Sequence, residues 1–299
     1  MYKWLISELR KAPAVSPVIT KCARPVVDCP ESVAASFAAL TSTVKYTADL
    51  GVPIIATFSD THLRDHAKDF QIVCQILWLF RSYFYAPVYI HLLFSPLLKH
   101  FPPRGQVIGK GHVNSGYTIH DEVIVVFRLD EWPKVFAHEC LHYFRTEAGL
   151  HSKTFPFPPA KLYEAHCEVW ARIINCALCS LATGAPLSTI LERERLFAGI
   201  QLVKILDHSG FTLADFLSDS FDGYRENTNV FSYYVIAGVL LQTTDYARDS
   251  PDGLIARPDM LSIYRRVKKR LPFKVIKREL DNASPYLKTT AKMSISDGK

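Results

Sequence analysis

The chain has 299 residues, 48% of them hydrophobic and 12% aromatic, which is enough to build one large domain around a core of its own. Only 21% are charged, and glycine and proline contribute 13 and 18 residues, so the composition excludes a collagen, a coiled coil and a wholly disordered chain. Lysine and arginine exceed aspartate and glutamate by 35 to 29, and this mild excess of +6 points to no particular partner.

The first third of the chain predicts an irregular arm, two helices and then strands. Residues 1–30 contain four prolines that break regular structure, so we expect an irregular N-terminal arm there. Helical patterns follow at about 31–50 and 64–82. Strand-like runs then cover 88–94, 112–119 and 122–128, and a tight turn at His120 and Asp121 joins the last two.

From Asp130 onward the pattern is almost entirely helical. Asp130 is a suitable N-cap, Pro133 is tolerated in a first turn and Gly149 suits a C-terminal stop, which predicts a helix over about 131–148. Gly184 ends a second helix that starts near residue 158. Further helices are expected at about 189–208, 212–219, 229–247 and 258–270.

These elements predict an α+β fold with one domain over residues 31–280. A small mixed sheet occupies a lobe of about 31–130, a helical lobe covers about 131–280, and the helix over 131–148 lies between them. The polar residues 281–299 are expected to form a flexible tail.

Cysteine usage and the N-terminus favour an intracellular protein that is not secreted. The seven cysteines are odd in number, which argues against a disulfide framework and for a reducing compartment. Cys176 and Cys179 have CxxC spacing, but they lie in an apolar helical run with no second CxxC, so packing is favoured over a metal or redox site. The first ten residues lack the apolar run of a signal peptide.

Membrane insertion is not predicted either. The most apolar stretch, residues 70–98, is interrupted by Arg81, Pro87, His91 and Pro96. A spanning helix needs about 20 apolar residues without such breaks. We therefore expect a buried helix followed by a buried strand.

The segment that carries chemistry is His138-Glu139-Cys140-Leu141-His142, an HExxH motif. Residues four apart share one face of a helix, so both imidazoles can reach a single zinc ion. Glu139 lies beside them and can take a proton from a zinc-bound water. The competing interpretation is a helix that carries two solvent-facing histidines and a glutamate.

Zinc needs a third protein ligand if water is to hold the fourth position. Glu164 and Glu168 lie four apart on the next helix; such like charges repel on a plain helix but become favourable when they face a dication. The alternative is that Glu168 pairs with Arg172 on a solvated face and that Glu164 is unused. His166 points well away from both glutamates around the helix, so we expect it off the metal.

HExxH followed on a later helix by ExxxE resembles the gluzincins of the thermolysin and neprilysin type. The resemblance implies that Glu164 ligates zinc and that Glu168 holds a histidine ligand through its other ring nitrogen. This sequence has Glu168 where those families carry aspartate, and the gap from His142 to Glu164 is slightly longer than is usual there.

A second resemblance covers more of the chain, about residues 85–245. The segments 112–118, 123–128, 131–136, 163–171 and 231–235, together with HExxH, are similar to uncharacterised metallopeptidases of large double-stranded DNA viruses. This implies a zincin-like fold, one zinc per chain and a location in the host cytoplasm or the virion, and it implies no substrate.

Residues around the motif supply candidates for substrate contact. Gluzincins hold a substrate backbone along an edge strand, and Asn114, Ser115 and Gly116 occupy the matching place in the sequence. An ordinary edge strand is the alternative. Tyr233 and Tyr234 are candidate catalytic donors to the oxyanion, as is His208 beside Asp207, although each also suits core packing or a surface role.

The basic run from Arg265 to Arg270, continued by Lys274, Lys277 and Arg278, could suggest nucleic acid or an acidic membrane. Stacking aromatics do not interleave with it in a recognised module, so a solvated helix face is favoured and no specific nucleic acid is predicted.

The leading hypothesis is a zinc-dependent metallopeptidase that acts on a peptide or protein, with Glu139 as general base. One alternative is a non-enzymatic virion or scaffold protein that retains a zincin fold. Another is a carboxypeptidase-like zinc hydrolase that trims one partner protein, for which Arg145 or Arg172 would clamp the chain terminus.

Overall fold

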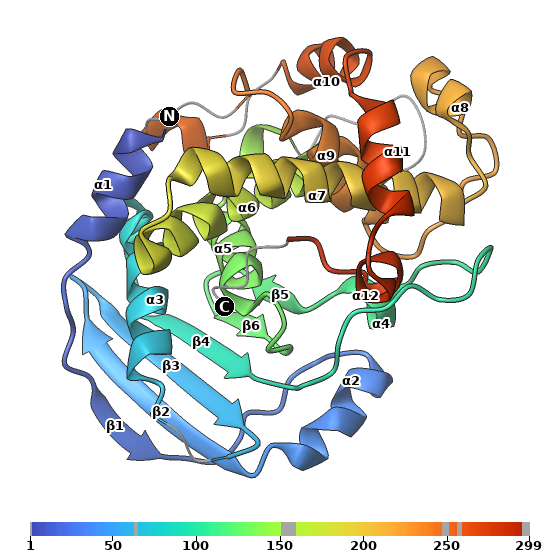
Figure 1. Ribbon diagram of the computed structural model, residues 1–299. Helices are drawn as coiled ribbons and strands as arrows, with labels where there is room; N and C mark the ends of the chain where they lie inside the picture. Colours follow the sequence, from blue (N-terminus) through green and yellow to red (C-terminus); the bar gives the residue numbers. More distant parts are fainter. Residues whose placement is uncertain (1, 63–64, 151–159, 247–250, 256–258, 295–299) are drawn as a thin grey trace.

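The computed structural model describes the chain except for residues 1, 63–64, 151–159, 247–250, 256–258 and 295–299 (Figure 1). Six strands form one mixed sheet in the order β1-β2-β3-β4-β6-β5. Strands β3, β4 and β6 run parallel, whereas β1, β2 and β5 pair antiparallel with their neighbours. The strands are β1 Val18–Lys21, β2 Ser42–Asp49, β3 Pro53–Asp60, β4 Val88–Leu93, β5 Gly116–Ile119 and β6 Val123–Val126.

The other regular elements are helices, and most of them belong to the C-terminal half of the chain (Figure 1). Those that precede the last strand are α1 Lys3–Lys11, α2 Glu31–Ser36, α3 Ala67–Trp78 and α4 Lys110–Val113. Those that follow it are α5 Trp132–Tyr143, α6 Leu162–Thr183, α7 Leu187–His208, α8 Leu213–Ser218, α9 Ala237–Leu240, α10 Met260–Lys268, α11 Phe273–Asp281 and α12 Pro285–Thr289. A π-helical turn, η4 Phe231–Ile236, leads directly into α9.

Both faces of the sheet are covered, as the strand pattern requires. Side chains alternate between faces with a period of two. On β6, Ile124 and Val126 therefore join the main core beneath the long helices, whereas Val125 joins a smaller cluster with Val33 of α2 and Phe37. This double burial accounts for the unbroken apolar composition of β6.

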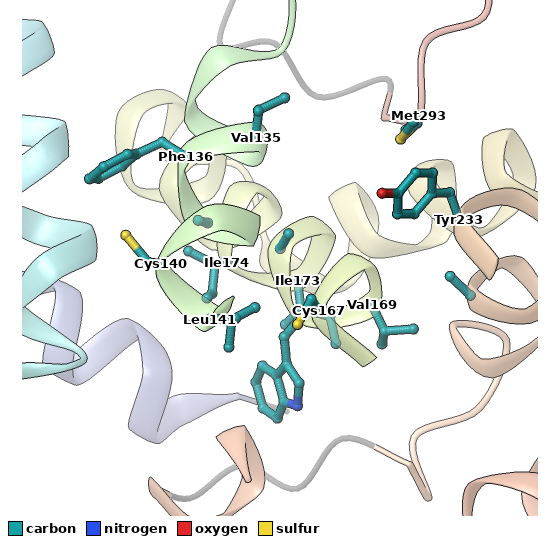
Figure 2. Close-up of a cluster of buried hydrophobic side chains, with 14 of the residues drawn as sticks. Val135, Phe136, Cys140, Leu141, Cys167, Val169, Ile173, Ile174, Tyr233 and Met293 are labelled. Atoms are coloured by element: carbon teal, nitrogen blue, oxygen red, sulfur yellow. The ribbon is translucent and has the colours of Figure 1, made fainter. Parts of the chain in front are cut away.

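Helix α5 lies between the sheet and the helical half, and it contacts both β5 and α6. Figure 2 shows how its apolar side chains are divided. Phe136 and Cys140 point toward α3, whereas Leu141 points into the layer that α6 fills with Ile173 and Ile174. Since α5 is buried on nearly all sides, its polar residues at 138, 139 and 142 are held in fixed positions.

Several predictions of secondary structure are confirmed. Residues 88–94 give β4, residues 64–82 contain α3, and the helices expected near 189, 212 and 258 are α7, α8 and α10. Gly184 ends α6 with a left-handed φ of 73°, a conformation that costs glycine nothing. The mixed α and β composition, with the sheet in the N-terminal half, also agrees with the predicted class.

The predicted irregular arm over 1–30 is wrong for its beginning. Residues 3–11 form α1, because Leu5 and Leu9 lie four apart and bury completely against the core. Residues 18–21 form β1 at one edge of the sheet.

The predicted helix over 31–50 is wrong in its second half. Residues 42–49 form β2, in which Val44 and Tyr46 point into the core at strand spacing. Strand β3 was not predicted. The strand expected over 112–119 begins only at Gly116, because residues 110–113 form α4, and the helix expected over 131–148 ends at Tyr143.

The flexible tail expected over 281–299 is wrong for its described part. After α12, residues 290–294 are buried, and Lys292 pairs with Asp130 at 2.7 Å. The backbone N–H groups of Met293 and Ser294 donate to the Glu131 carboxylate. The polar side chains of this segment therefore find partners in the interior, which composition alone does not reveal. Residues 295–299 lie outside the described residues.

Candidate metal centre

Helices α5 and α6 bring together three side chains that could hold a metal ion. The Nε2 atoms of His138 and His142 are 3.1 Å apart. Glu164 Oε2 lies 3.1 Å from His142 Nε2 and 3.4 Å from His138 Nε2. Helical i, i+4 spacing stacks the two imidazoles on one face of α5, and the first turn of α6 supplies the carboxylate.

These spacings fit a zinc ion. Bonds of about 2.1 Å in a tetrahedron place ligand atoms roughly 3.4 Å from one another. The three atoms form a cluster of metal-binding type, and they open onto a cavity of about 580 Å³ in which a fourth ligand has room. The donor set of two imidazoles and one carboxylate is one that catalytic zinc uses.

His142 is oriented by Glu147. Its Nδ1 lies 3.0 Å from Glu147 Oε1 and 3.7 Å from the Cys167 sulfur. A proton held on Nδ1 toward this carboxylate leaves the lone pair of Nε2 facing the cluster. Glu147 is not part of the predicted site, since it follows the end of α5, where Arg145 takes a left-handed φ of 54° and turns the chain back.

His138 is oriented by Glu168, the residue that the resemblance places beside a histidine ligand. His138 Nδ1 lies 3.2 Å from Glu168 Oε2, although without the alignment of a full hydrogen bond. Lys134 Nζ donates to both oxygens of Glu168, at 3.0 and 3.1 Å.

Glu168 is buried, so the alternative that places it on a solvated helix face is wrong. Arg172 Nε does donate to Glu168, at 2.8 Å, but both side chains are fully buried rather than on a solvated face. Burial raises the pKa of Glu168, yet the cations Lys134 and Arg172 outweigh burial and hold this pKa below its usual range. Glu168 is therefore an ionised carboxylate inside the protein.

Glu164 is oriented by a residue that the sequence analysis also missed. Asn229 Nδ2 donates to Glu164 Oε1 at 2.7 Å and lies 3.4 Å from the Tyr233 hydroxyl. Asn229 thus occupies one carboxylate oxygen and leaves Oε2 to face the histidines. No local motif marks Asn229, which reaches the site from the loop before η4.

Glu139 lines the same cavity, next to both histidines. Its Oε2 accepts a hydrogen bond of 3.0 Å from Thr118 Oγ1 on β5. Burial raises the pKa of Glu139, which makes its carboxylate a stronger base than that of an exposed glutamate.

Two of the three predicted substrate-contact residues line the cavity. Asn114 and Gly116 do so, and β5 is an edge strand of the sheet, as expected. Ser115 instead lines a small cavity of about 30 Å³ behind His138 and Glu139, which corrects its predicted role in the main cavity. Asn114 Oδ1 accepts a hydrogen bond from Thr228, on the loop that forms the opposite wall.

Of the candidate oxyanion donors, one lines the cavity and two do not. Tyr233 lines the cavity and packs edge-on against the His138 ring, with 5.6 Å between ring centres. Tyr234 is fully buried away from it, and its hydroxyl donates to the Ala291 carbonyl, so its predicted catalytic role is wrong. His208 contacts the Gln106 carbonyl and lines a different cavity.

The remaining candidates lie elsewhere. His166 is buried between the Tyr246 hydroxyl and the Leu254 carbonyl. As predicted, it is not part of the group formed by His138, His142 and Glu164, which we call the metal cluster. Arg172 is buried and Arg145 pairs with Asp121, and neither lines the cavity, so both predicted terminus clamps are wrong.

Other features of the sequence have structural places. Cys176 and Cys179 are buried in α6, as packing residues are. In the basic run, Arg265 and Lys269 are exposed, but Lys268 is buried and pairs with Asp219. Among the residues that the structure describes, no helix is long and apolar enough to cross a membrane.

Comparison with known proteins finds no match: neither a family model, nor a curated protein, nor a solved structure matches the chain. The resemblance to gluzincins therefore remains one of motif and spacing.

Proposed function

We propose that this protein is a zinc-dependent metallopeptidase. The observation that carries the proposal is the convergence of His138, His142 and Glu164 within hydrogen-bond distance of one another at the floor of a cavity. A structural zinc site needs no base, and the presence of Glu139 at the same cavity favours catalysis.

The residues of the chain suit each step of peptide hydrolysis. Zinc, when bound, would polarise the scissile carbonyl and make a water molecule more acidic. Glu139 takes a proton from the attacking water and later delivers it to the leaving amine. Tyr233, with its hydroxyl near Asn229 and its ring on His138, is the candidate donor to the developing oxyanion.

The proposed substrate is an extended peptide. On one side β5 pairs with β6, and on its other side this edge strand borders the cavity through Gly116, Tyr117 and Thr118. A peptide that adds to β5 as a further strand would run past Glu139, which Thr118 holds from the same strand.

The test is a cleavage profile on a peptide library whose members have free or blocked ends. Zinc-loaded wild type should cleave, and Glu139→Gln should bind zinc with unchanged affinity yet lose about 100-fold or more in rate. Cleavage of blocked peptides indicates an endopeptidase, and cleavage only next to free ends indicates a trimming enzyme. A zinc-loaded wild type that cleaves nothing, or a Glu139→Gln protein with full activity, would contradict the proposal.

A further inference from the structure

A second cavity, larger than the one at the metal cluster, lies beside α7. Its volume is about 720 Å³, and none of the described residues that line it also lines the metal-cluster cavity. Pockets of this size hold molecules with one apolar body and a few polar groups. The cavity is formed by α7, α11 and the segment around residues 101–104.

The lining of this cavity, which we call the α7 cavity, is apolar over much of its surface. Phe101, Phe211 and Phe273 contribute aromatic side chains, and Val203, Leu206 and Leu280 contribute aliphatic ones. Phe101, Phe211 and Phe273 are each only partly buried, so they present ring surface that an apolar ligand can cover.

Lys204 provides a buried positive charge in the same cavity. The residue is 8% exposed, and its Nζ donates to the carbonyl oxygens of Leu287 and Thr290 at 2.8 and 2.6 Å. Among the described residues, no carboxylate forms an ion pair with it. Burial lowers the pKa of Lys204 to about 7, because nothing anionic compensates for the lost hydration.

Further cations line the α7 cavity, and together with Lys204 they favour an anionic ligand. Arg104 pairs with Asp207 at 3.0 Å, which leaves Lys277 and Lys288 as further cations of the lining. Asp281 is the other acidic residue of the lining, and its backbone carbonyl accepts a hydrogen bond from Lys288.

We propose that the α7 cavity binds an amphipathic carboxylate, a molecule with one anionic end and an apolar chain. The carboxylate pairs with Lys204, and the chain lies against Phe101, Phe211 and Phe273. The ligand supplies the counter-charge that the protein lacks at this position, and its chain covers the partly exposed rings. This inference does not depend on the metal cluster or on peptide hydrolysis.

The test is isothermal titration calorimetry of the full-length protein with decanoate, decanol and acetate. Decanoate should bind at least about tenfold more tightly than either of the others, because each of these lacks one half of the recognised chemistry. Lys204→Met, which keeps an apolar stem, should weaken decanoate by at least about tenfold and leave decanol unchanged.

A second pair of variants covers the case in which Lys204→Met fails to fold. Leu213 lines the α7 cavity on α8, and Leu217 lies on the same helix outside the lining; both are about equally exposed, at 43% and 40%. Leu213→Asp should weaken decanoate through charge repulsion, whereas Leu217→Asp should leave binding unchanged. Equal effects of the two would overturn the proposal.

Proton uptake gives a readout that loss of structure does not mimic. Decanoate favours the charged form of Lys204, so binding near pH 8 should take up a proton, seen as a dependence of the heat on the buffer. Lys204→Met should abolish this uptake. The other charged or titratable groups that face the cavity are Arg104, Asp207 and His208, with Lys277 and Asp281 of α11 and Lys288 of α12. Equal affinity for decanol and decanoate, or binding of an acidic aromatic peptide but not of decanoate, would refute the proposed ligand class.

Discussion

Several charged side chains near the candidate metal centre are buried away from water, and they interact with one another and with His138. Glu168 accepts hydrogen bonds from Lys134 and Arg172, all three buried, and lies 3.2 Å from the His138 ring. Removing one charge from such a group leaves the remaining ones uncompensated, which costs about 3–5 kcal/mol. Glu168 therefore links the stability of the fold to the orientation of His138, a proposed metal ligand.

This link gives the first prediction at the residue scale. Glu168→Gln preserves the shape of the side chain and removes its charge, so it should lower the free energy of unfolding by about 3–5 kcal/mol. It should also weaken zinc binding by roughly 10- to 100-fold, because His138 loses the carboxylate that orients it. Urea denaturation and competition with a zinc chelator measure the two effects.

The matched control for Glu168 is Glu192→Gln, an exposed residue of α7 that should change stability by less than about 0.5 kcal/mol. Adding Lys134→Met to Glu168→Gln should recover part of the lost stability, since one of the two cations that face Glu168 is removed as well. A Glu168→Gln protein with wild-type stability and zinc affinity would show that the buried ion pairs contribute to neither.

The lowered pKa of Lys204 predicts that the stability of the protein depends on pH. Its pKa is about 7 in the folded protein and 10.5 for an ordinary lysine. Between these values the unfolded chain binds more protons than the folded chain, so this residue makes stability rise with pH. Below about pH 7 both states are charged, and the folded state bears the full cost of the buried charge.

Lys204→Met removes this dependence. Its free energy of unfolding minus that of wild type should be larger at about pH 6.5 than at about pH 9.5, because the variant no longer bears the cost of a buried charge at the lower pH; denaturation at both values measures this difference. The exposed Lys269→Met variant should show the same difference from wild type at both. If the Lys204→Met difference were also independent of pH, the depressed pKa would be wrong.

At the scale of elements, the close contact between β5 and α5 positions the proposed general base. A Cβ atom at Gly116 would lie 2.7 Å from the Val125 carbonyl oxygen, 2.9 Å from Val135 Cγ1 and 3.2 Å from Glu139 Cγ. The first of these neighbours is backbone in the paired strand β6, so it cannot turn aside. The absence of a side chain at residue 116 is what lets Glu139 approach the edge strand.

Gly116→Ala should therefore separate β5 from α5. We expect a loss of about 1–3 kcal/mol in stability and a larger loss of peptidase activity than of zinc affinity, since the metal cluster itself is untouched. Gly149→Ala is the control, because a Cβ there meets nothing within 4 Å. Full activity in Gly116→Ala would show that peptides do not depend on this contact.

The helices and strands also show which parts of the fold can be predicted from sequence patterns. The long helices α6 and α7 could be predicted because their apolar periodicity persists over many turns and Gly184 marks a stop. Strand β2 could not, because a short segment that mixes alanine and lysine with threonine and valine satisfies helical and strand patterns alike. Helix α1 was not predicted, because the prolines of residues 1–30 indicate irregular structure for the whole segment, although α1 ends before the first of them.

The same limit applies to the site. His138, Glu139 and His142 were predictable because helix geometry alone fixes their spacing, and the gluzincin resemblance added Glu164. Glu147, Asn229 and Lys134 were not, because each reaches the site through tertiary packing that no local spacing encodes. Tyr233 and Tyr234 are neighbours in sequence, and only the tertiary structure shows that Tyr233 lines the cavity.

At the scale of the whole molecule, the sheet half and the helical half meet at α5, and the C-terminal residues 290–294 close the junction. The Glu131 carboxylate at the start of α5 binds Lys99 and the backbone N–H groups of Met293 and Ser294. Met293 Sδ also lies 3.3 Å from Lys134 Nζ of the same helix. The C-terminal end of the described chain thus contributes to the environment of the central helix.

The most direct test of the account is the zinc content of the purified protein, measured by mass spectrometry of the metal after loading and removal of free ions. Wild type should hold one zinc per chain, and Glu164→Ala should lose most of it because two imidazoles remain as the protein ligands. Glu192→Ala, an exposed glutamate of α7, should retain one zinc per chain. A wild-type protein that holds no zinc, or a Glu164→Ala protein that binds zinc as tightly as wild type, would contradict the proposed metal centre.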